Sequence, residues 1–95
     1  MKKAEEYIKE FRAEADKFKV LGDIAVMMLH EVADLAKIRK PGNDRQWAAI
    51  IEEVDRKWRR FAAQTPEAKP DGLKELIKLK FPDIFEIWMK ERQRL

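Results

Sequence analysis

Residues 20–38 read VLGDIAVMMLHEVADLAKI, and thirteen of these nineteen side chains are apolar. The polar side chains form a narrow line, with Glu31 at its edge: Asp23, His30, Asp34 and Lys37. A helix that is apolar on nearly every side is surrounded by other helices in a folded protein. The stretch therefore predicts an all-α protein in which this segment has neighbours on most sides.

The apolar positions continue upstream in steps of four and three, from Ala4 to Phe18, and the phase does not change at Gly22. A glycine inside a helix costs only about 1 kcal/mol relative to alanine, so the pattern favours one unbroken helix over 3–39. Such a helix would be about 55 Å long, whereas a compact chain of this size has a radius of gyration of about 12 Å. Its aromatic stripe would then need a second subunit: Tyr7, Phe11 and Phe18. The alternative is a break at Gly22 that folds the two halves back on each other.

Helix-breaking and helix-capping residues indicate where the remaining helices begin and end. Lys40-Pro41-Gly42 ends the first element, and Asn43 with Gln46 forms a capping box for a second helix that runs to about Ala63, antiparallel to the first. Pro82 suits a first helical position and separates two short C-terminal helices. The sequence thus predicts a small helical bundle, one domain over residues 1–95.

The composition excludes several classes of function. With 21 basic and 18 acidic residues the net charge is +3, too small an excess to mark a dedicated polyanion binder. There is no cysteine and one histidine, which excludes disulfides and Cys/His zinc sites. Serine is also absent, so covalent catalysis has no plausible nucleophile. Because no apolar run reaches about 20 residues and no secretory signal begins the chain, we expect a cytoplasmic protein without membrane contact.

Two pairs of acidic residues, each spaced three apart, are the candidate metal ligands: Glu31 with Asp34, and Glu52 with Asp55. In an antiparallel hairpin centred on Pro41-Gly42, Glu31 lies level with Glu52. Carboxylates on facing helices could hold Mg²⁺. However, Glu52 lies about 140° from the apolar stripe of its own helix, so a solvated face with ion pairs is the competing interpretation.

These acids also carry a family resemblance. Glu31-Val32-Ala33-Asp34-Leu35-Ala36-Lys37, followed after a loop by Ile51-Glu52-Glu53-Val54-Asp55, resembles the all-α nucleoside-triphosphate pyrophosphohydrolases, the MazG-like family. The resemblance implies that Glu31, Glu52 and Asp55 hold Mg²⁺ and that the protein releases pyrophosphate from a nucleotide. Met27 and Met28 stand where the family has its first two glutamates, and methionine does not bind Mg²⁺. The resemblance therefore implies a degenerate site.

His30 is the only histidine, and Asp34 follows it by one helical turn. The pair distantly resembles a helical zinc motif, but no second histidine or cysteine completes it. We expect His30 to hydrogen-bond Asp34 within a crowded helix.

The densest basic cluster consists of Arg56, Lys57, Arg59 and Arg60. Residues 37–95 carry 15 basic and 10 acidic side chains, so the C-terminal half is basic and is a candidate nucleic-acid interface. A solvated helix face is the alternative. Trp58 lies on the apolar stripe and is expected in the core, not as a base-stacking platform.

The sequence as a whole predicts a non-enzymatic helical interaction or regulatory protein that forms a homo-oligomer, a dimer, or contacts another protein. The expected interaction surface is Tyr7, Phe11, Phe18, Met27 and Met28, because methionine and aromatic side chains make adaptable contacts. No cofactor is expected. The alternatives are the magnesium-dependent pyrophosphohydrolase relative and the nucleic-acid binder.

Overall fold

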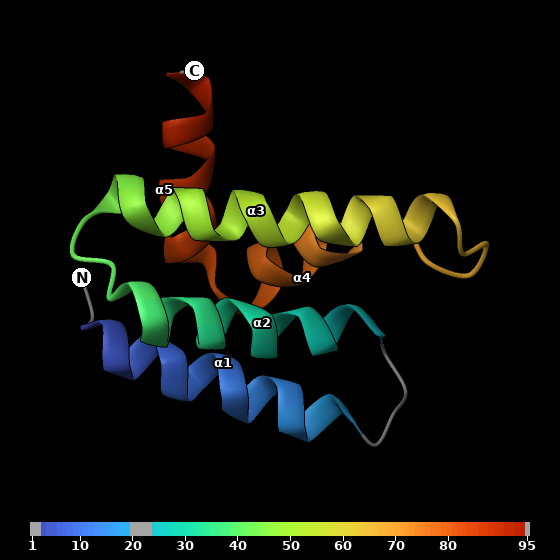
Figure 1. Ribbon diagram of the computed structural model, residues 1–95, viewed down its shortest axis with the longest axis horizontal. Coiled ribbons are helices and arrows are strands. Elements are labelled where there is room, and N and C mark those ends of the chain that lie inside the picture. The colour runs from blue at the N-terminus through green and yellow to red at the C-terminus, as the bar shows by residue number, and fades with distance from the viewer. Residues whose placement is uncertain (1–2, 20–23, 95) are drawn as a thin grey trace.

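Five helices form the computed structural model, which describes residues 3–19 and 24–94 (Figure 1). The helices are α1 (Ala4–Lys19), α2 (Ile24–Arg39), α3 (Asp44–Ala63), α4 (Gly72–Lys80) and α5 (Pro82–Gln93). No strand occurs in this part of the chain, so the predicted all-α bundle is confirmed. Within the same residues, every helix is too short or too polar to cross a bilayer.

The prediction of one unbroken N-terminal helix is wrong. α1 and α2 run antiparallel side by side (Figure 1), and Arg12 of α1 pairs with Asp34 of α2 at 3.3 Å. The chain therefore reverses between Lys19 and Ile24. Gly22 itself lies outside the described residues. The reversal lets the apolar side of α1 be buried within the same chain, which a projecting helix could not achieve.

The hairpin of α2 and α3 forms as predicted. Asn43 caps α3, its side chain accepting a 2.9 Å hydrogen bond from the Gln46 backbone N–H. The Gln46 side chain accepts from the N–H of Gly42 at 2.7 Å, one residue earlier than in a standard capping box. Lys40, just beyond the end of α2, has the left-handed φ of 49° that turns the chain toward α3.

The short helices α4 and α5 lie behind α2 and α3, and α5 projects beyond α3 (Figure 1). Pro82 begins α5, and Phe81 before it is non-helical, as predicted. Gly72 begins α4 against Trp58, where an added Cβ would lie 3.1 Å from the indole ring. The Trp58 Nε1–H donates to the Lys69 carbonyl at 2.7 Å, so this tryptophan anchors the α3–α4 connection.

An aromatic cluster at the centre of the core joins the first helix to the last. The Phe11 ring lies 4.4 Å from that of Phe81, and the Tyr7 ring 5.3 Å from that of Trp47. The Tyr7 hydroxyl donates to the Asp83 carboxylate at 2.5 Å. The cluster therefore buries the inner face of α1 without a second subunit.

Candidate functional site

The first predicted acid pair is bound by basic side chains. Glu31 forms an ion pair with Lys57 of α3, and Asp34 forms one with Arg12 of α1. The two carboxylates lie about 60° apart on α2, and one reaches toward α3 while the other reaches toward α1. This divergence separates them as metal ligands.

The second acid pair has two different surroundings: Glu52 contacts α5, and Asp55 is paired within α3. Glu52 accepts a hydrogen bond from the Trp88 indole and pairs with Arg92 at 3.4 Å. The expectation that Glu52 points to water is wrong, because α5 crosses α3 and covers it. Asp55 is 1% exposed and accepts from Arg59 Nε at 2.9 Å.

The four candidate ligands Glu31, Asp34, Glu52 and Asp55 are therefore not brought together. In residues 3–19 and 24–94, no three histidine or acidic side chains are grouped so that they could hold a metal ion. Glu31 pairs with Lys57, which follows Glu52 by five positions on α3, and each carboxylate takes a nearby cation as its partner. The ion pairs of the competing interpretation are present, but Glu52 and Asp55 lie between helices and not on a solvated face, and the pyrophosphohydrolase resemblance stays a prediction.

The buried carboxylate of Asp55 is half satisfied. Its second oxygen, Oδ1, has no hydrogen-bond partner. Arg59, which donates to the other oxygen of Asp55, also donates from Nη2 to the carboxylate of Asp71 at 2.6 Å, just before α4. These two hydrogen bonds raise the pKa of the Arg59 guanidinium above its usual range, so the bridge keeps its positive charge. Arg59 thus connects α3 to α4.

His30 does not bind Asp34. Its Nε2 lies 3.1 Å from the Asp16 carboxylate of α1. The prediction failed because the reversal after α1 places that helix beside His30, while Asp34 takes Arg12 as its partner.

The predicted interaction surface divides into two parts. Tyr7 and Phe11 are fully buried by the core, so they cannot form an exposed surface, and this part of the prediction is wrong. The side chain of Phe18 lies outside the described residues. Met27 is 40% exposed and Met28 half-buried, so this part of the interaction surface stays a prediction.

The structure adds two residues that the sequence analysis did not single out. Ile24 is 45% exposed and Ile38 is 76% exposed. Together with Met27, they lie on the side of α2 opposite its buried residues, within about 60° at 100° per residue. We call these three side chains, with Glu31 and Leu35 between them, the outer face of α2. A helical wheel centred on the core-facing residues would have identified it.

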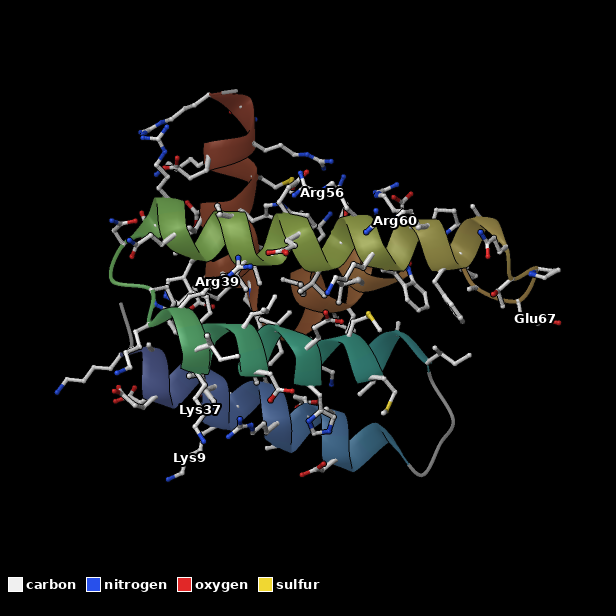
Figure 2. The ribbon with its side chains drawn as sticks, in the orientation of Figure 1. Lys9, Lys37, Arg39, Arg56, Arg60 and Glu67 are labelled. Carbon is white, nitrogen blue, oxygen red and sulfur yellow. The ribbon has the colours of Figure 1, made fainter. Side chains whose placement is uncertain are left out.

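The predicted basic cluster is also split by the helical rotation. Lys57 and Arg59 are bound to Glu31 and Asp55, on two different sides of α3. Arg56 and Arg60 extend from the side of α3 away from α2 (Figure 2). Neither forms an ion pair in the described part of the chain.

Comparison with known proteins adds no family. The chain matches no protein-family model, no curated protein and no solved structure.

Proposed function

We propose that this protein acts by association through the outer face of α2, as a non-enzymatic helical interaction protein, and that its partner is a second copy of the same chain. One observation carries the proposal: α2 is the most apolar helix, yet Ile24, Met27 and Ile38 remain exposed on it. Exposed apolar side chains that line up on one helix face are typical of contact surfaces.

The spacing of the outer face favours a second copy. Around Glu31, apolar residues occur seven positions away on both sides, at Ile24 and Ile38, and four positions away on both sides, at Met27 and Leu35. Two such helices packed antiparallel would place Ile24 against the other copy's Ile38. A pattern that reads alike in both directions is self-complementary, which is what a two-fold dimer needs.

Charge does not oppose this packing. Glu31 would lie near the two-fold axis and meet its counterpart, and like charges at that distance would repel. Lys57 already pairs with Glu31 in each copy, so the axis would carry two ion pairs. The outer face has five residues over about 21 Å, fewer than the roughly 20–30 residues that each partner contributes to a standard interface, so we expect a weak dimer that depends on concentration.

Sedimentation equilibrium tests the proposal. The mass should rise from 11.3 kDa toward twice that value as the protein is concentrated into the range of about 1 mM. Ile38→Glu should keep the protein monomeric. Ala49→Glu is the control, because Ala49 on α3 is exposed but lines a cavity beside α5, away from the outer face. A monomer at every concentration, or an equal effect of both variants, would contradict the proposal.

Engineered cysteines test the orientation, since the chain contains none of its own. Glu31→Cys should cross-link to itself, and Ile24→Cys should cross-link to Ile38→Cys in a mixture. A parallel pair would instead cross-link Ile24→Cys to itself. That result would keep the dimer and reject the antiparallel orientation.

A further inference from the structure

The corner between α3 and the projecting part of α5 is lined with arginine. α5 crosses α3 over Ala48 and Ala49, whose small side chains leave a cavity of about 240 Å³. Arg45, Arg56 and Arg92 line this cavity with the alanines. Arg60 follows Arg56 by one turn, on the same side of α3 (Figure 2).

Three of these guanidinium groups are uncommitted. Arg45, Arg56 and Arg60 lie within about 60° on α3 at 100° per residue, and all three are exposed. None of them forms an ion pair within residues 3–19 and 24–94. We call these three residues the arginine row.

Two of the nearby carboxylates are already bound. Glu52 is held by Trp88 and Arg92, and Glu91 pairs with Arg94 at 3.4 Å. Two further carboxylates reduce the positive charge of the row without pairing with it: Glu53, which is bound by Arg39 and also attracted by Arg56, and Asp44, which lines a cavity with Arg45. Guanidinium groups bind phosphate and carboxylate oxygens with paired hydrogen bonds.

The length of the row identifies the class of ligand. Arg45 and Arg60 are fifteen residues apart, which is about 22 Å along the helix. One phosphate group cannot span this distance, but one strand of a duplex carries a charge about every 3.4 Å along its axis. The tryptophans are buried in the core, Trp88 being 1% exposed, and the exposed ring of Phe61 lies about 100° around α3 from Arg60, so the row itself offers no aromatic ring to stack on unpaired bases.

From this arrangement we infer that the arginine row binds the phosphate backbone of a nucleic-acid duplex without reading its sequence. This site is separate from the outer face of α2 and differs from the cluster expected from the sequence, because it includes Arg45 and excludes Lys57 and Arg59. Binding through phosphates alone predicts weak affinity, with dissociation constants of about 10⁻⁴ to 10⁻⁶ M that rise with salt.

Fluorescence anisotropy with labelled duplexes of about 20 base pairs, one of DNA and one of RNA, tests the inference at salt concentrations of about 50 to 200 mM. The triple variant Arg45→Gln, Arg56→Gln and Arg60→Gln should weaken binding about tenfold or more and flatten the salt slope by about three. The matched control removes the same charge elsewhere, with Lys9→Gln, Lys37→Gln and Lys40→Gln. These lysines are exposed and lie on α1 and at the end of α2.

Each outcome decides the inference. A large loss in the triple variant and a small one in the control would support it, and the relative affinity of the two probes would show which duplex is preferred. Equal losses would show that net charge alone is responsible and would overturn it. Binding of poly-glutamate as tightly as either duplex would also overturn it, in favour of an acidic protein partner. Circular dichroism of both variants checks that they retain the helical fold.

Discussion

The inner face of α1 and the outer face of α2 are two apolar rows on neighbouring helices with opposite surroundings. Phe11 in the first row is fully buried against Phe81 and Trp47. Ile38 in the second row is 76% exposed. Both rows have helical spacing, yet the chain covers one and leaves the other exposed, so spacing alone does not decide whether a row is buried within its own chain.

The largest expected effect tests this contrast on the covered side. Phe11→Ala should lower the free energy of unfolding by about 3–5 kcal/mol, because it removes a ring from the centre of the aromatic cluster. Ile38→Ala should change it by less than about 0.5 kcal/mol, because its side chain faces solvent in the monomer. Urea unfolding at low protein concentration measures both, and equal losses would break the comparison.

A smaller loss in the free energy of unfolding is expected when the buried carboxylate of Asp55 loses its cation. Arg59→Met should cost about 2 kcal/mol, since it leaves the Asp55 carboxylate buried without a cation, although Arg59 is partly exposed and solvent screens the pair. Arg56→Met, on the same helix but without a carboxylate partner, is the control and should cost little. Adding Asp55→Leu to Arg59→Met should recover most of the loss. Failure to recover would mean that Arg59 acts mainly through Asp71.

The smallest effect belongs to the half-exposed pair of Arg39 and Glu53, which joins α2 to α3 at 2.6 Å. The hydrogen bond from Arg39 holds the pKa of Glu53 below its ordinary value of 4.5. Because the folded-state pKa is lowered, the pair stabilises the fold above about pH 4.5, and this contribution is lost as the pH falls through the lowered value. Urea unfolding of Arg39→Gln between about pH 7 and pH 3 should show a flatter acid dependence than the unchanged protein. An identical acid dependence would contradict the assignment.

Much of the fold could be predicted from local signals. Asn43 and Pro82 marked the starts of α3 and α5, and the apolar period marked the helices. The reversal after α1 could not be predicted, because the apolar phase passes unchanged through residues 20–23. A heptad row has the same spacing whether its neighbour comes from the same chain or from another.

The candidate sites were less predictable, for two reasons. Glu52 is covered by Trp88, which lies 36 residues later, and no local pattern indicates that contact. Arg56 and Lys57 are adjacent in sequence but lie about 100° apart on the helix, so they reach different surroundings. Which cations remain unpaired depends on where the acidic residues of other helices lie.

The hydrogen bond from Tyr7 to Asp83 has a consequence for biosynthesis. It joins positions 76 residues apart, and Phe81 beside it supplies the ring nearest to Phe11. During translation, the first helix leaves the ribosome long before these C-terminal residues are made. Tyr7 and Phe11 therefore stay incompletely shielded until Phe81 and Asp83 have left the ribosome, and a product that terminates before residue 81 would expose this aromatic pair to chaperones and proteases.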